Sequence, residues 1–170
     1  MPRPDMTDVE LMQFIRLLRT HPEQYLRIAQ DDIRQFPDDP GAYVDRHDAW
    51  ARLGRLDLAL ADIDKAMSLE DDLGTRLQRA VLLRRMGRYR EAIDEFNRCE
   101  AIDETAVTGF IYAVERAECH ARLGNLEAAL TDCESLREDH WQPFLNGGLG
   151  GSKSEITAAA RRLAAEAQKS

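Results

Sequence analysis

A glycine-rich segment near the end of the chain has residue types that hold phosphate in many proteins. Residues Gly147–Ser154 read GGLGGSKS, which misses the phosphate-binding pattern GxxxxGK[ST] at one position, where Ser152 replaces glycine. That pattern needs a β-strand before it and backbone amides curled around the phosphate, and no strand is predicted here. We interpret the segment as a loop with a helix cap, and keep nucleotide binding as a remote alternative.

Cysteine and histidine side chains could in principle bind zinc. The candidates are Cys119, His120, Cys133 and His140. Zinc needs ligands that converge in tetrahedral geometry, and nothing in this spacing forces convergence. We expect packing roles for these residues, and predict no metal or cofactor. No catalytic triad order stands out from the helical background, so no catalytic residue is predicted and the chain is not expected to be an enzyme.

Arginines and carboxylates recur along the chain at a fixed offset. Each of three arginines is followed sixteen residues later by an acid, in the pairs Arg46 and Asp62, Arg79 and Glu95, and Arg116 and Asp132. If the arginine lies on one helix and the acid on the next, each pair can form an ion pair. We expect these pairs to be structural, with contact to a ligand as the alternative.

These pairs belong to three imperfect copies of one pattern. Arg79–Asp103 reads as two short helices that meet at Gly87, with apolar residues at helical spacing, and Arg46–Leu69 and Arg116–Leu136 repeat it. The hinge glycines Gly54, Gly87 and Gly124 are 33 and 37 residues apart. This period is typical of a helix-turn-helix repeat, whose helices bury their apolar stripes against neighbouring units.

Over about residues 40–140 the pattern resembles the tetratricopeptide repeat. The family's leucine-like residue before the glycine is Leu53, Met86 or Leu123, and its alanine five residues after the glycine is Ala59, Ala92 or Ala129. The next small position holds Ala66, Cys99 and the larger Leu136. The proline that the family places at the repeat end is replaced by Asp71, Glu104 and Trp141. The resemblance implies an all-α, right-handed solenoid of stacked helix pairs.

One further set of residues shares a face of the first helices, at i, i+4 and i+8. In tetratricopeptide proteins this face lines a concave groove, so the resemblance implies a groove with an apolar floor and three arginines at one side. The candidate partner-binding residues are Val44, Asp48, Arg52, Leu77, Val81, Arg85, Val114, Glu118 and Arg122. A peptide with an acidic group beside apolar anchors would suit this groove. The alternative is that the arginines are a solvated face.

The best-known groove chemistry of the family is a carboxylate clamp for the tails of heat-shock chaperones, built from Lys, Asn and Arg. The matching positions here are Val44, Asp48, Gln78, Ile111 and Glu115. Because the clamp residues are absent, binding of heat-shock chaperone tails is not expected.

Charge and composition restrict the class of partner. The chain of 170 residues is 44% hydrophobic and 32% charged, with a net charge of −8 that disfavours nonspecific binding to nucleic acid or anionic membrane. Its three cysteines follow no disulfide or zinc spacing, which favours a reduced, cytoplasmic setting. Neither a signal peptide nor a run of the ~20 apolar residues needed for a membrane span is expected.

The two ends of the chain depart from the repeat. Residues 1–39 are predicted to form a degenerate leading helical pair, with Thr20 capping its second helix, and Thr75 is predicted to cap the first helix of the second copy. Residues 141–152 form a glycine-rich apolar loop, and residues 153–170 a capping helix opened by Ser152 and Glu155. The loop's large apolar residues are Trp141, Phe144, Leu145 and Leu149. They either cover the last repeat, or dock a partner or fold into the groove.

The sequence thus predicts one domain with about nine helices and no sheet. Its expected function is a non-catalytic interaction module or small adaptor that holds a peptide segment of a partner protein in the groove. A dedicated chaperone or immunity-type protein that neutralises one partner is the alternative. Homo-oligomerisation stays open, because the leading pair can either cap the stack or dock on another copy.

Overall fold

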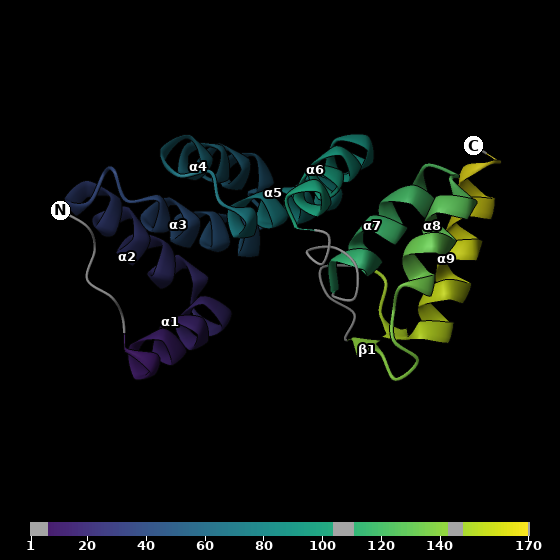
Figure 1. The fold of residues 1–170 in the computed structure, drawn as a ribbon. Helices are drawn as coiled ribbons and strands as arrows, with labels where there is room; N and C mark the ends of the chain where they lie inside the picture. The colour runs from purple at the N-terminus through teal and green to yellow at the C-terminus, as the bar shows by residue number, and fades with distance from the viewer. Residues whose placement is uncertain (1–6, 104–110, 143–147, 170) are drawn as a thin grey trace. The chain divides into compact units, whose positions relative to one another are not determined.

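The computed structural model describes residues 7–103, 111–142 and 148–169, and every statement below refers to them. Within these ranges the chain is almost entirely helical (Figure 1). The helices are α1 (Asp8–Thr20), α2 (Pro22–Gln35), α3 (Pro40–Arg52), α4 (Leu56–Leu69), α5 (Leu73–Arg85), α6 (Tyr89–Ile102), α7 (Ile111–Arg122), α8 (Leu126–Glu134) and α9 (Lys153–Ala167). The prediction of an all-α helical repeat is confirmed.

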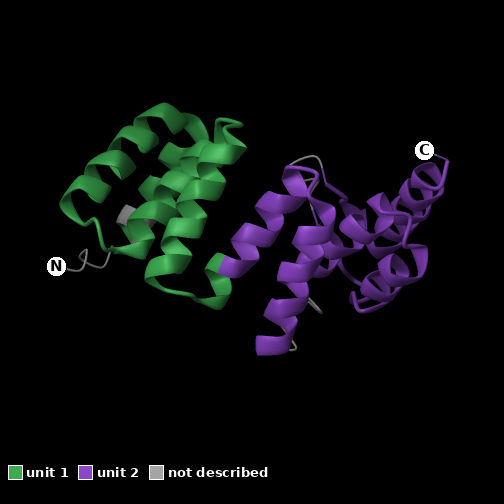
Figure 2. Cartoon of the chain, turned by 90° about the horizontal axis from the view of Figure 1, so that it is seen from above, with its two compact units in different colours: residues 1–75 green, residues 76–170 purple. Residues whose placement is uncertain are grey.

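The chain divides into two compact units, residues 1–75 and 76–170 (Figure 2). In the first unit α2 packs against α1 and α3, and α3 packs against α4. Small buried residues such as Ala42, Ala49 and Ala59 let these helices approach closely, around the fully buried Ile63. The leading pair is joined to this core by Tyr25, whose hydroxyl donates a 2.8 Å hydrogen bond to Asp45 Oδ1.

The predicted hinge has the same geometry in all three copies. Gly54, Gly87 and Gly124 have φ of +73°, +76° and +76°, a conformation that residues with a Cβ seldom adopt. In each copy the N–H after the glycine donates a 2.9 Å hydrogen bond to a carbonyl five residues back, which ends the first helix as a Schellman motif. The donors are Arg55, Arg88 and Asn125. The same turn therefore ends the first helix of three described helix pairs.

The predicted ion pairs are also present in each copy. Arg46 Nη2 lies 2.6 Å from Asp62 Oδ1, and Arg79 Nη1 lies 2.9 Å from Glu95 Oε1. Arg116 donates to Asp132 at 2.7 Å and also to Glu100 at 2.6 Å. In each case the arginine joins the first helix of a pair to the second, as the structural interpretation predicts.

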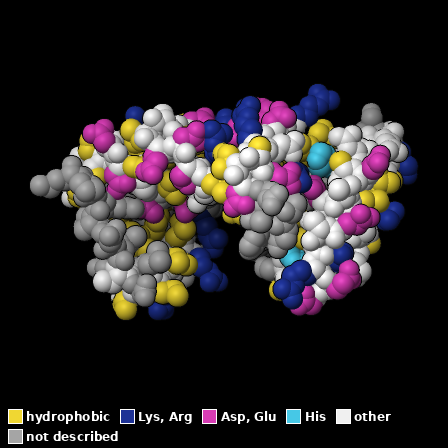
Figure 3. Space-filling view, in the orientation of Figure 1, with side chains coloured by type: hydrophobic (Ala, Val, Ile, Leu, Met, Phe, Trp, Pro, Cys, Tyr) yellow, Lys and Arg dark blue, Asp and Glu magenta, His cyan; other side chains and the backbone are white. Residues whose placement is uncertain are grey.

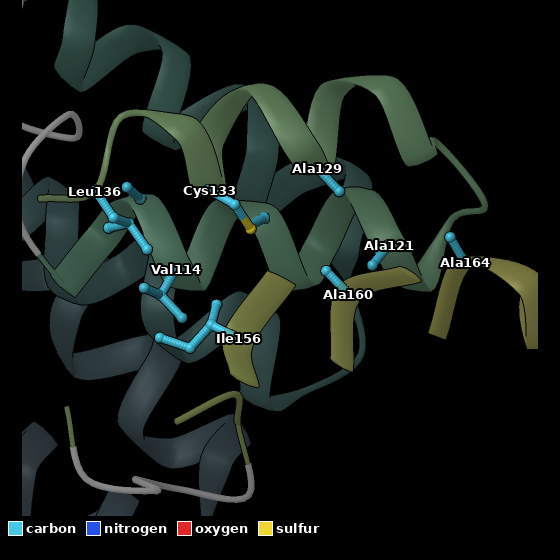
Figure 4. Close-up of a cluster of buried hydrophobic side chains, with 10 residues drawn as sticks. Val114, Ala121, Ala129, Cys133, Leu136, Ile156, Ala160 and Ala164 are labelled. Atoms are coloured by element: carbon cyan, nitrogen blue, oxygen red, sulfur yellow. The ribbon is translucent and has the colours of Figure 1, made fainter. Parts of the chain in front are cut away.

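In the second unit α7 is the central helix of its C-terminal part. It packs against α6, α8 and α9, and α8 also packs against α9. Figure 4 shows the shared core, in which Val114 of α7 lies beside Ile156 of α9, with Cys133 of α8 and Leu136, just after α8, close by. The capping helix therefore covers an apolar face of α7 and α8 that would otherwise meet solvent.

Three details differ from the sequence predictions. Trp141–Gln142 (β1) and Gly151–Ser152 (β2) form a short antiparallel ladder, where no sheet was expected. The predicted cap at Thr20 is wrong, because its hydroxyl donates to the carbonyl of Arg16 at 2.9 Å and α2 starts without a side-chain cap. The predicted cap at Thr75 is also wrong, because α5 begins at Leu73 and Asp72 accepts the Thr75 N–H.

The capping box of the last helix is confirmed, with Ser152 and Glu155 bonding each other's backbone. The surface in Figure 3 carries interspersed acidic and basic side chains. Among the helices described, none combines the length and the apolar character that crossing a membrane would require. Phe144, Leu145 and the insertion at residues 105–108 lie outside the described residues.

Candidate functional site

The predicted groove residues fall in both units, and each unit is described by itself. In the first unit Val44 and Asp48 are half-buried on α3, and Arg52 is exposed. Asp48 Oδ1 lies 3.8 Å from Nε2 of the buried His47. In the second unit the candidates lie on α5 and α7 and differ widely in exposure.

On α5, Leu77 is buried, whereas Val81 and Arg85 are half-buried. On α7, Val114 and Glu118 are only 1% and 2% exposed, whereas the Arg122 side chain is 39% exposed. Val114 is buried because Ile156 of the capping helix packs on it (Figure 4). The apolar residues Leu77 and Val114 are therefore buried and do not line an open groove. The candidates on α5 and α7 that a partner can reach are Val81, Arg85 and Arg122.

A buried charge cluster joins α5 to α7. Arg84 Nη1 donates a 2.9 Å hydrogen bond to Glu118 Oε2, and both side chains are only 3% exposed. The Arg84 Nε group is also paired with the Glu115 carboxylate. Arg122 reaches the other Glu118 oxygen at 3.3 Å. Two carboxylates on α7 thus share one fully buried guanidinium from α5.

Burial sets the electrostatics of this cluster. Desolvation raises the pKa of the Glu115 carboxyl, although the neighbouring Arg84 guanidinium opposes the shift. Nearby Glu118 adds to the rise, since two carboxylates close together disfavour each other's charge. Arg84 is therefore the main cation that opposes the effect of burial on the Glu115 carboxyl.

Sequence reasoning missed Arg84, although the repeat register contains a signal. Arg84 stands three residues before its hinge glycine, where the other copies have Ala51 and Ala121. Both alanines are buried, at 6% and 0% exposed. An arginine in a position that is buried alanine elsewhere must find charged partners inside the fold, and Glu115 and Glu118 are those partners.

The segment before the capping helix lies on the same cluster. The Leu149 N–H donates a 3.3 Å hydrogen bond to Glu118 Oε2, and the Leu149 side chain packs against the core that contains Val114. A Cβ added at Gly148 would lie 2.9 Å from Glu118 Oε2 and 3.1 Å from Arg84 Nη1. Gly148 and Leu149 therefore lie directly on Glu118. Trp141, by contrast, is 66% exposed.

The groups that a phosphate would need in residues 148–154 already have partners. The Ser152 N–H donates to Glu155 Oε2 at 2.7 Å, so the start of α9 is capped by its own carboxylate. Lys153 Nζ donates to the Leu136 carbonyl at 2.7 Å and lies 2.8 Å from Glu138 Oε1. This arrangement is that of a loop with a helix cap.

The described residues contain no cluster of three or more histidine, cysteine or acidic side chains placed to hold a metal ion. Cys99, Cys119 and Cys133 are free and buried. Burial raises the pKa of the Cys119 and Cys133 thiols and lowers the pKa of the His120 imidazole, which keeps all three groups neutral. Their packing roles agree with the sequence interpretation.

The α5–α6 hairpin gives the family assignment. Residues 74–105 match the family model described as tetratricopeptide repeat. The chain contains a tetratricopeptide repeat. No curated protein matches the chain. The tetratricopeptide match covers the helix pair at Gly87. The helix pairs at Gly54 and Gly124 have the same hinge geometry and an equivalent arginine–acid ion pair, which relates them to the matched pair.

Proposed function

We propose that this tetratricopeptide protein is a non-catalytic interaction module, which binds a segment of a partner protein on one face of its second unit. The α5–α7 face is defined by Leu77, Val81, Arg84, Arg85, Val114, Glu118 and Arg122. The observation that carries the proposal is the tetratricopeptide match over α5 and α6, because tetratricopeptide repeats generally bind other proteins and are generally not catalytic. The corresponding residues of α3 are Val44, Asp48 and Arg52, and we propose the same role for them in the first unit.

The chemistry of the accessible groups favours an acidic partner with apolar anchors. Arg85 and Arg122 stand two residues before their hinge glycines, and Val81 lies one turn before Arg85 on the same helix. A guanidinium at the rim of an apolar patch attracts carboxylates and sets the register of the bound segment. The apolar patch supplies affinity by desolvation. Chaperone tails of the heat-shock type are not part of the proposal, because the positions of the clamp hold Val44, Asp48, Gln78, Ile111 and Glu115 instead of Lys, Asn and Arg.

A protein dedicated to one partner is the second candidate. It is favoured by α1, where Val9 and Met12 are 67% and 69% exposed and Ile15 is 45% exposed, each three residues from the next. An apolar face of this kind suits a larger interface than a single peptide needs. An interface well above the standard ~1,600 Å² that includes α1 would favour this candidate over an adaptor.

Nucleotide binding is not proposed. The Ser152 amide and the Lys153 ammonium, which a phosphate would need, are bonded to Glu155, Glu138 and the Leu136 carbonyl. A phosphate would have to replace a carboxylate that is held at the helix start by two hydrogen bonds.

The proposal predicts that a charge-reversed face loses its partner. A full chain with Arg85→Glu and Arg122→Glu should retain at least about tenfold less of the partner than the wild type in a pull-down from native lysate, read by mass spectrometry. The matched control is Arg90→Glu with Arg162→Glu, which changes the net charge equally at two exposed positions on α6 and α9. The control should retain the partner.

The melting temperature of the Arg90 and Arg162 control should stay close to that of the wild type, because surface substitutions seldom change stability much. The face variant should melt somewhat lower but stay folded, because Arg122 also pairs with the buried Glu118. A partner that is retained equally by the face variant and by the control would contradict the proposed face. Loss of the fold in the face variant alone would contradict the placement of Arg85 and Arg122 at an accessible rim.

A further inference from the structure

Gly148 and Leu149 make contacts that a bound peptide would make. The Leu149 amide donates to a Glu118 carboxylate oxygen, and the leucine side chain packs on the apolar cluster beside Val114. Gly148 sits so close to Glu118 Oε2 and Arg84 Nη1 that a Cβ would reach 2.9 and 3.1 Å. Residues 148 and 149 thus supply three things to this face: a backbone N–H, a leucine side chain and a glycine where a Cβ would be crowded.

Hydrogen bonds to residues outside the face hold Gly148 and Leu149 in place, whereas their own contact with the face is comparatively weak. Beside the face, Gln142 Nε2 donates to the Leu149 carbonyl at 3.0 Å, and the β1–β2 ladder pairs Gln142 with Gly151. On the face, the hydrogen bond from Leu149 to Glu118 is 3.3 Å long, at the weak end of the usual range. Leu149 is half-buried rather than buried.

Glu118 does not depend on the segment for its charge balance. Arg84 lies 2.9 Å from one of its oxygens and Arg122 lies 3.3 Å from the other. If Leu149 leaves, both ion pairs remain, so the acid still has its partners. The cost of exposing the face is then mainly the apolar contact of one leucine.

We propose that Gly148 and Leu149 are an internal ligand of the α5–α7 face, which a partner displaces by presenting its own segment of a small residue followed by leucine. This inference rests on the proposed function and specifies it further. The partner's leucine takes the place of Leu149 and its amide N–H is accepted by Glu118. A small residue before the leucine is favoured, because a Cβ there would come within 2.9 Å of Glu118 Oε2 and 3.1 Å of Arg84 Nη1, and these two buried side chains are held by each other.

The direct test is titration of a labelled full chain with the segment as a free peptide. The probe is an acetylated, amidated peptide with the sequence GLGGSK, which copies residues 148–153. The host chain carries Gly148→Ala, since the added Cβ collides with Glu118 and Arg84 and so displaces the internal segment. The matched control peptide is GDGGSK, which replaces the leucine by an acid.

The variant's α7 amides near Glu118 should shift in nuclear magnetic resonance spectra and saturate at peptide concentrations of order millimolar. The same peptide should shift the wild-type amides about tenfold less, because the tethered segment competes at a high effective concentration. The control peptide should shift neither chain. If Gly148→Ala perturbs the fold, Leu149→Asp displaces the segment by charge and serves as the host.

Equal shifts in wild type and variant would overturn the inference, because the face would not be occupied by its own segment. An absence of shifts in both chains would overturn it too, because the face would not recognise a glycine–leucine segment. Neither result depends on capturing a partner. If the pull-down captures a partner but the titration gives no shifts, the proposed function is supported and the internal ligand is not. If the titration gives the expected shifts but no partner is captured, the internal ligand is supported and the proposed function is not.

Discussion

Replacing Arg84 by alanine is expected to lower the free energy of unfolding by about 3–5 kcal/mol. Arg84 is 4% exposed and is the cation that Glu115 and Glu118 share, at 7% and 2% exposed. Removing one partner of a buried ion pair leaves uncompensated charge in the interior, which costs far more than the pair contributes. Urea unfolding followed by circular dichroism measures the loss. Arg90→Ala, at an exposed position of α6, should change it by no more than about 0.5 kcal/mol.

The deficit of the Arg84→Ala variant should depend on pH. The pKa of Glu115 in the folded protein is raised above its ordinary value of 4.5. The contribution of Glu115 to the free energy of unfolding is therefore fully present below pH 4.5, and it is lost as the pH rises through the pKa of the folded state. Without Arg84 the pKa rises further, and Glu115 takes up a proton at a higher pH than in the wild type. The stability difference between variant and wild type should therefore narrow as the pH falls from 7 towards the pKa of Glu115 in the folded wild type. A constant difference over that range would show that the lost stability is not electrostatic.

A triple variant separates charge from packing at the same position. Arg84→Met with Glu115→Gln and Glu118→Gln keeps similar volumes and removes the three buried charges together, while the partly exposed Arg122 stays charged. It should recover most of the stability lost in Arg84→Ala, because replacing a complete buried ion cluster is often neutral. If the triple variant is as unstable as Arg84→Ala, shape rather than charge compensation is the role of Arg84.

The three repeat ion pairs should differ in importance, and Arg116 should matter most. Arg116→Ala is expected to cost about 3–5 kcal/mol, because its side chain is 9% exposed and that of Asp132 is 5% exposed. Burial disfavours the charge of Arg116, but its hydrogen bonds to Asp132 and Glu100 outweigh burial and raise its pKa. Burial also raises the pKa of Asp132, against the effect of Arg116. Asp132 would be left as an uncompensated acid.

The other two pairs serve as internal controls for this ranking. Arg46→Ala should cost about 1–3 kcal/mol, because the Arg46 side chain is 26% exposed and water can reach Asp62 in its place. Arg79→Ala should cost least, about 1 kcal/mol or less, because Arg98 and Arg76 still lie 2.6 and 3.4 Å from Glu95. Unfolding free energies of the three variants give the order. Equal losses would contradict a ranking set by burial and by the cations that remain near each acid.

Periodic features of the fold could be predicted from the sequence because the same residues recur at the same spacing in three copies. A glycine at a left-handed hinge and an arginine sixteen residues before an acid each recur in register, so their geometry follows from helix spacing alone. The cap at Ser152 was also predictable, since its partner Glu155 is three residues away. The caps at Thr20 and Thr75 were not, because the same residue pattern fits several starting points, and local contacts at His21 and Asp72 decided where each helix begins.

The site was only partly predictable, because burial and non-local contacts determine it. The register placed Leu77, Val81, Val114 and Glu118 on one side of their helices, but the exposure of Val114 depends on Ile156, which lies 42 residues away. The sequence left three roles open for the large apolar residues of the loop, Leu149 among them: to cover the last repeat, to dock a partner or to enter the groove. Which residue would make the contact could not be derived, because Gly148 and Leu149 have no periodic relation to Glu118.

The measurement that tests the account most directly is the affinity of the captured partner for three full-length chains. We predict that the charge-reversed Arg85→Glu and Arg122→Glu chain binds at least about tenfold more weakly than the wild type, and that Gly148→Ala binds more tightly because its face is vacated. The first variant damages the proposed face and the second exposes it, so the two affinities should change in opposite directions. Equal affinity for all three chains, with the fold intact, would contradict the claim that partner and internal segment share the α5–α7 face.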